Sequence, residues 1–256
     1  MGGVIGGLLV GFSLGLTGGG GSIFALPILI YALGVPVRTA IGLSLAVVGL
    51  TAGFGAAMRL RAGDVDLRAG VVFSIAGMVF APLGSWLGGF VPGVWLLSVF
   101  ATLMGFVGWR MWSGKGENAD VPGPCVLLGN GRLGPGCHVR LSLAGAVAGV
   151  LSGLFGIGGG FVIVPALLYV TGTSIHRAVA TSLMVIFLIS SSGVAAKVVQ
   201  GLDFPMPLAV LFPLGGLAGM LAGGALRSRL SGPALRRVFA AAMWVVAAWM
   251  LWQRGA

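Results

Sequence analysis

The chain has 256 residues, of which 57% are hydrophobic and 8% are charged, and it carries a formal net charge of +10. A soluble domain contains about 25% charged residues, so this composition excludes an ordinary water-soluble fold. Apolar runs long enough to span a hydrocarbon core of about 30 Å predict an all-α polytopic membrane protein instead. The runs cover residues 41–58, 70–91, 94–109, 178–196 and 204–226, with a shorter one at 238–252.

The excess of positive charge has an ordinary explanation in such a protein. Arg and Lys in the loops set the orientation, because cytoplasmic loops carry more of them, so we expect no nucleic-acid partner. All five acidic residues fall in loops or at segment ends, and there is no phosphate-binding G-x-x-x-x-G-K-[ST] motif. We therefore expect no enzyme activity, no cofactor and no metal site. A membrane interior without carboxylates also argues against an acid-based proton pump and suits an anionic substrate.

Four consecutive glycines, Gly18 to Gly21, interrupt the N-terminal apolar stretch. Glycine in a helix interior costs about 1 kcal/mol relative to alanine, so the run predicts a break, with the helix restarting near Ser22. Unpaired backbone at membrane depth is tolerated only where it is buried in protein or lines a cavity. Its N–H groups, with the start of the next helix, can bind an anion. The alternative explanation is close helix packing through small residues.

The break occurs a second time, 138 residues further along the chain. "GFSLGLTGGGGSIFALPILIYALG" (11–34) aligns with "GVLSGLFGIGGGFVIVPALLYVTG" (149–172). Between 11–63 and 149–201, 18 of 53 positions are identical, whereas such a composition gives roughly a tenth by chance. The sequence therefore predicts two homologous repeats.

We expect a first transmembrane repeat at 1–112 and a second at 139–256, joined by a cytoplasmic linker at 113–138. The linker is rich in Gly and Pro, which is typical of a loop. Each repeat holds an interrupted helix, which re-enters on the same side in one of the two topologies below, followed by three transmembrane helices.

Two topologies fit this pattern. If the interrupted segments cross the membrane, there are eight spans, the halves are parallel, and the loop cations divide nine against six between the sides. If the segments are re-entrant, there are six spans, the halves are inverted, and the division is twelve against three. The positive-inside rule favours the stronger asymmetry. It places the linker in the cytoplasm and both termini outside, with the two breaks facing each other near the midplane.

Interrupted segments at equivalent positions of two repeats are the best sequence indication of a transporter's substrate site. We expect the backbone of both breaks to bind the substrate. Hydroxyls early in the following helices are further candidates, although they could equally bond to their own helix backbone. The candidate substrate-binding residues are Gly18, Gly19, Gly20, Gly21, Ser22, Ser44, Gly156, Ile157, Gly158, Gly159, Gly160, Thr181 and Ser182.

The segments "SGLFGIGGGFVIVPALL" and "HRAVATSL", with their first-half counterparts through "RLRAGDVDLRAG", resemble the TauE/SafE family of sulfite exporters. The resemblance covers both halves. It implies a multi-pass protein of the bacterial inner membrane that moves sulfite, sulfoacetate or related organosulfonates, usually outward. By motif match, the substrate candidates are Gly18 to Ser22 and Gly156 to Gly160. The halves differ where Gly19 and Ser22 stand opposite Ile157 and Gly160, so the two breaks need not be equivalent.

The sequence thus predicts a secondary transporter, an exporter, whose partners are a small sulfur-containing anion and the lipid bilayer, with a homodimer as a further option. One alternative is a passive small-anion channel built from the same breaks, which would show unsaturable flux. Another is a structural membrane protein without transport, whose glycines only pack helices.

Overall fold

The computed structural model describes residues 2–19, 21–113, 136–156, 158–201, 206–227 and 232–255, and these residues form helices and turns without a β-strand. Five helices of the described chain, namely α3, α4, α5, α6 and α8, are long and apolar enough to cross a membrane. This confirms the expected all-α, multi-pass class. The elements are α1 (Gly2–Thr17), α2 (Gly21–Pro27), the π-helix η1 (Ile28–Ala32), α3 (Val37–Arg61), α4 (Leu67–Phe90), α5 (Gly93–Trp112), α6 (Cys137–Phe155), α7 (Gly160–Thr171), α8 (Ile175–Val199), α9 (Met206–Arg227) and α10 (Gly232–Gly255).

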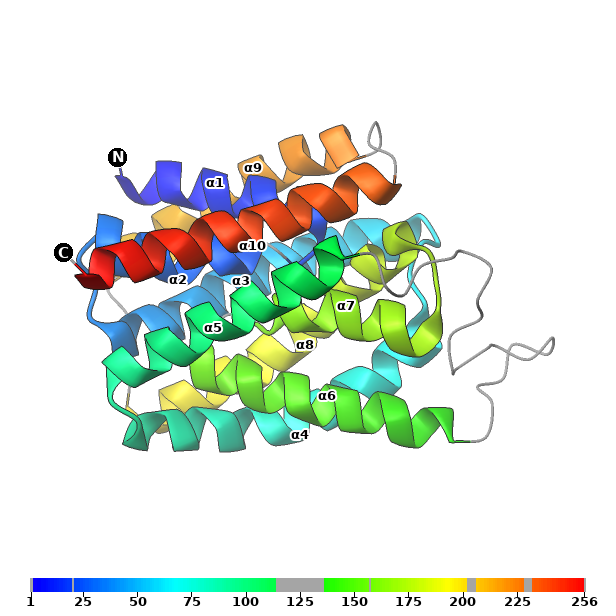
Figure 1. The fold of residues 1–256 in the computed structure, drawn as a ribbon, viewed down its shortest axis with the longest axis horizontal. Helices are drawn as coiled ribbons and strands as arrows, with labels where there is room; N and C mark the ends of the chain where they lie inside the picture. The colour runs from blue at the N-terminus through cyan, green and yellow to red at the C-terminus, as the bar shows by residue number, and fades with distance from the viewer. Residues whose placement is uncertain are drawn as a thin grey trace.

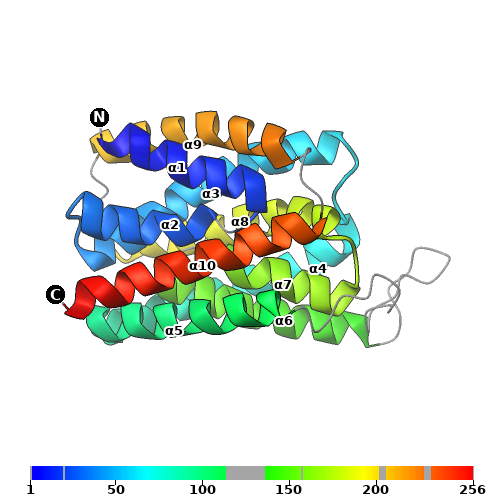
Figure 2. The ribbon, with the colours of Figure 1, turned by 45° about the horizontal axis from the view of Figure 1, so that its top comes forward.

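The helices lie side by side along one long axis (Figure 1). Both chain termini are at one end of the bundle, which we call the terminal face. Helix α6 begins at the opposite end, which we call the linker face (Figure 2). Helices α3, α4 and α5 pass between the two faces in alternating directions, and α8, α9 and α10 do the same in the opposite sense.

The interrupted segments form two helical hairpins. Helix α1 runs inward from the terminal face and stops inside the bundle at Thr17, and α2 with η1 returns to the same face. Helix α6 runs inward from the linker face, and α7 returns to it. The two hairpins therefore enter from opposite ends.

The first arm of each hairpin packs closely on a helix of the other half, α1 on α9 and α6 on α4. Glycines make these contacts possible. A Cβ on Gly11 would collide with the backbone of Gly216, and a Cβ on Gly149 would collide with the backbone of Gly77. Gly-xxx-Gly spacing in α1 and α6 thus serves backbone-to-backbone helix packing.

Helices α3 and α8 form the antiparallel centre of the bundle. The most apolar stretch of each of these two helices is 67% buried, whereas the corresponding stretch is 39% buried or less in the other three candidate spans. Gly49 lies against Ser190 and Gly53 against Phe187. At the linker face, the backbone N–H of Asp66 donates to Thr181 Oγ1 at 2.9 Å. The hairpin tips meet beside this central pair.

Candidate functional site

The first break confirms that the glycine run interrupts the helix. Helix α1 ends at Thr17, Gly18 adopts a left-handed φ of 73°, and α2 starts at Gly21, one residue before the expected Ser22. Gly18 N–H closes α1 by donating to Leu14 O at 2.7 Å. Of the site candidates here, Gly20 lies outside the described residues.

The second break is longer and is built from more left-handed residues. Helix α6 ends at Phe155, and φ is 71° at Gly156, 64° at Gly158 and 67° at Gly159. Helix α7 then begins at Gly160, as expected from the sequence. Left-handed backbone is open to glycine without steric cost, which explains why glycine occupies these positions. The candidate Ile157 lies outside the described residues.

A serine from the other half holds each break in place. Ser44 Oγ on α3 donates to Gly156 O and lies 3.1 Å from Ile41 O. Ser182 Oγ on α8 lies 3.3 Å from Gly18 O and 2.8 Å from Val179 O. A hydroxyl has a single proton to donate, so each serine shares its hydrogen bond between a carbonyl of its own helix and a carbonyl of the opposite break. Both hydroxyls are thus engaged with backbone carbonyls in this structure.

Thr181 contributes elsewhere. Its hydroxyl accepts from the N–H of Asp66, the residue whose own carboxylate caps α4 by accepting from Ala69 N–H at 3.1 Å. Thr181 therefore connects α8 to the start of α4 at the linker face, and the structure does not bring it into the glycine breaks.

The two breaks touch each other. A Cβ built on Gly160 would lie 2.6 Å from Gly19 Cα, and one built on Gly19 would overlap the Gly160 backbone. Any larger residue at either position would separate the hairpin tips. The described structure thus brings the two hairpin tips into contact.

Two further serines flank the second break, and sequence reasoning missed both. Ser152 on α6 and Ser190 on α8 are fully buried, and their hydroxyls have no hydrogen-bond partner in the described structure. A Cβ on Gly158 would lie 2.8 Å from Ser190 Oγ, and one on Gly159 would lie 3.3 Å from Ser152 Cβ. The spacing of Ser182 and Ser190, two helical turns apart on one face of α8, was the available signal for Ser190.

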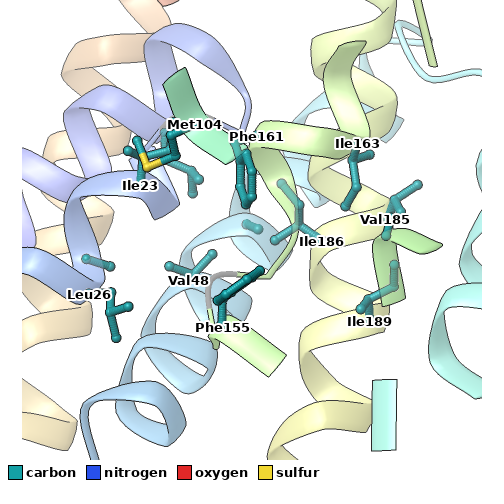
Figure 3. Close-up of a cluster of buried hydrophobic side chains, with 14 of the residues drawn as sticks. Ile23, Leu26, Val48, Met104, Phe155, Phe161, Ile163, Val185, Ile186 and Ile189 are labelled. Atoms are coloured by element: carbon teal, nitrogen blue, oxygen red, sulfur yellow. The ribbon is translucent and has the colours of Figure 1, made fainter. Parts of the chain in front are cut away.

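The surroundings of the breaks are apolar. Phe155 and Phe161 flank the second break, and Ile186 and Val48 approach it from α8 and α3 (Figure 3). In the part of the chain that the structure describes, the acidic residues are Asp64 and Asp66, both in the turn before α4. No group of three metal-ligating side chains occurs among these residues. Uncharged donors in apolar surroundings suit an anion better than a cation.

A cavity of about 350 Å³ opens among α1, α3, α8 and α9. Arg59 lines it, and Arg59 Nη1 lies 3.2 Å from Asp64 Oδ2. Gly15, three residues before the first break, and Leu183, next to Ser182, also line the cavity. It therefore brings a cation close to the first hairpin tip.

A bundle of membrane-spanning helices with two interrupted helices meeting at its centre is the architecture of a membrane transporter. The chain belongs to the TauE/SafE family: the family profile described as sulfite exporter TauE/SafE matches residues 3–250.

Curated relatives agree with this class. A probable membrane transporter protein of Xylella fastidiosa (strain Temecula1) is 36% identical over 251 residues, which cover 96% of this chain and 92% of the relative. The probable membrane transporter protein YdhB of Bacillus subtilis is 28% identical over 229 residues, covering 84% of this chain and 85% of YdhB. No solved structure matches the chain. The protein is therefore a multi-pass membrane transporter, and these names indicate transport rather than catalysis.

Proposed function

We propose that this transporter exports a small sulfur-containing anion, such as sulfite, sulfoacetate or a related organosulfonate, across the bacterial inner membrane. The observation that carries the proposal is the contact between the two glycine breaks, next to buried Ser152 and Ser190 hydroxyls that lack a partner among the described residues. The family description supports the substrate class.

We propose further that the protein crosses the membrane six times, with two inverted halves. Helix α1, with 16 residues, is about 24 Å long, which is shorter than the hydrocarbon core of about 30 Å. The aligned helices α3 and α8 run antiparallel, and the hairpins enter from opposite faces. These features support re-entrant hairpins rather than an eight-span, parallel arrangement.

The second break offers the better set of anion donors. Gly159 O accepts hydrogen bonds from the N–H groups of Val162 and Ile163, both at 2.9 Å. The N–H groups of Gly160 and Phe161, at the start of α7, have no acceptor within that helix, and the start of a helix carries a partial positive charge. Ser152 and Ser190 would add hydroxyl donors, which the first half lacks because Leu14 and Ala52 stand at the aligned positions.

The loop charges and the membrane potential bear on orientation and on direction of transport, respectively. The loop cations favour a cytoplasmic linker face. Whichever face is cytoplasmic, an anion leaving a cell that is negative inside gains about 2.3 kcal/mol per charge per 100 mV, so the membrane potential alone can drive its export by uniport.

The test is the thermal stability of the detergent-purified protein with sulfite, sulfate, thiosulfate, sulfoacetate, taurine and acetate. We expect one sulfur oxyanion to raise the unfolding temperature. The Ser190→Ala variant should fold normally, because the substitution removes an unpartnered buried hydroxyl. It should lower the affinity for that anion about tenfold or more, since a hydrogen bond to a charged group contributes about 1.5–3 kcal/mol.

The matched control is Ser74→Ala. Ser74 on α4 is also a buried hydroxyl without a partner among the described residues, but it is not among the nearest neighbours of any described glycine of the second break. It should leave the anion affinity unchanged. Absence of stabilisation by every anion, or equal weakening in both variants, would contradict the proposal and favour a structural role for the glycines.

A further inference from the structure

A buried lysine lies near the terminal face, outside the glycine breaks. Lys197, close to the end of α8, is only 8% exposed. Its Nζ donates to Gln200 Oε1 at 3.4 Å, and Gln200 Nε2 donates to the fully buried Ser85 Oγ at 3.3 Å. Gln200 itself is exposed. The amide of Gln200 thus bridges Lys197 to α4 at the surface of the bundle.

A lysine that merely snorkels along a helix end would hold its ammonium in water. Most of the Lys197 surface is buried instead, and a buried cation is costly unless it is paired. Another cation, the exposed Arg38 at the start of α3, contributes to the electrostatic environment of Lys197. Arg38 Nη2 donates to Gly89 O at 2.8 Å, one helical turn beyond Ser85 on α4. The carboxylates of the described chain, Asp64 and Asp66, are at the opposite face.

The aligned residue of the first half behaves differently. Arg59 occupies the position equivalent to Lys197 in the sequence repeat, lines the cavity described above and is paired with Asp64. The linker face therefore has a paired cation beside an open cavity. At the terminal face, the mostly buried Lys197 is linked through Gln200 to Ser85 on α4, and the exposed Arg38 binds α4 one helical turn further along.

We infer that Lys197 and Arg38 form an anion-binding site at the terminal face, which takes a small sulfonate or sulfite-like anion and which Gln200 closes in this structure. The inference rests on the proposed function and gives the exported anion a second site on its path. An anion between the two cations would remove their mutual repulsion and supply Lys197 with a charged partner. Opening requires only that the Gln200 side chain leave Lys197 and Ser85.

The test measures the local preference for anions without using a transport substrate. The variant Gln200→Cys, in a chain whose Cys125 and Cys137 are replaced by alanine, is treated with two thiol reagents of similar size. One is anionic, 2-sulfonatoethyl methanethiosulfonate, and the other is cationic, 2-(trimethylammonium)ethyl methanethiosulfonate. We expect the anionic reagent to react faster once each rate is divided by the rate of that reagent with a free thiol in solution. Adding Lys197→Met should lower the ratio of the two rates about tenfold.

Three further variants make the result specific. Arg38→Met should also lower the ratio, whereas Lys197→Arg should keep it. Arg68→Met, which removes an exposed cation at the linker face, should leave it unchanged.

A ratio that stays the same in both Lys197→Met and Arg38→Met would overturn the inference. The outcome is separable from that of the proposed function. If the ratio of the two rates depends on Lys197 but no anion stabilises the protein, the site is supported and the transport of a sulfur-containing anion is refuted. If a sulfur-containing anion stabilises the unaltered protein but the ratio of the two rates is unchanged in the variants, the proposed function stands and this site is refuted.

Discussion

At the scale of single residues, the glycines of the breaks meet two separate requirements. Gly18 and Gly156 need a left-handed backbone, with φ of 73° and 71°. They also leave no room for a side chain: a Cβ would lie 2.9 Å from Val179 Cα at Gly18 and 2.6 Å from Ile41 Cα at Gly156. Val179 and Ile41 occupy aligned positions of the repeat, so each break rests on the equivalent residue of the opposite half.

The two requirements can be separated by a matched pair of substitutions. Gly63 also has a φ of 73°, but no neighbouring atom lies within 4 Å of the position that a Cβ would take. Gly63→Ala should therefore cost only the left-handed strain of about 1–2 kcal/mol. Gly18→Ala should cost at least twice as much, because the strain and the backbone overlap add. Unfolding temperatures in detergent measure both, and equal losses would show that the close contact at Gly18 is unimportant.

At the scale of elements, the sequence predicted the interruptions well, because each glycine in a run adds to the cost of continuing the helix. The restart of α7 at Gly160 was correct, and that of α2 was one residue late. The π-helix at Ile28–Ala32 was missed. It follows Pro27, which lacks a backbone N–H, but the aligned Pro165 lies inside an ordinary α-helix. The difference therefore depends on tertiary packing that local sequence does not reveal.

The hairpin arrangement predicts where the two connections after the hairpins lie. Ala32 ends the first hairpin at the terminal face, and Ser174 precedes α8 at the linker face. Cysteines introduced as Ala32→Cys and Ser174→Cys, in the chain without native cysteines, should react with an impermeant maleimide from opposite sides of the membrane. Labelling of intact and opened cells measures this. Reaction of both from the same side would indicate eight spans and parallel halves.

At the scale of the whole molecule, the two faces differ although the halves are related in sequence. The cavity beside Arg59 opens near the linker face, whereas Lys197 is buried near the terminal face. In the inverted arrangement that we propose, movement of one half against the other would expose the central breaks to each side in turn.

The sequence predicted the two helix breaks, but only part of the candidate site. Aligned Ser44 and Ser182 stood out, yet the structure engages their hydroxyls with backbone carbonyls. Ser152 and Ser190 were missed because Leu14 and Ala52 replace them in the first half, so the repeat gives no hint of them. The hydrogen bonds that link Lys197 through Gln200 to Ser85 depend on the packing of α8 on α4, which local sequence does not reveal.

The most direct test of the central claim is the efflux of sulfite and of sulfoacetate from proteoliposomes loaded with each anion. We expect saturable efflux of at least one of them, which an inside-negative potential accelerates because the anion gains about 2.3 kcal/mol per charge per 100 mV. Flux that rises without saturation would identify a channel. No flux of either anion above that of protein-free liposomes would contradict export of sulfur-containing anions by this protein.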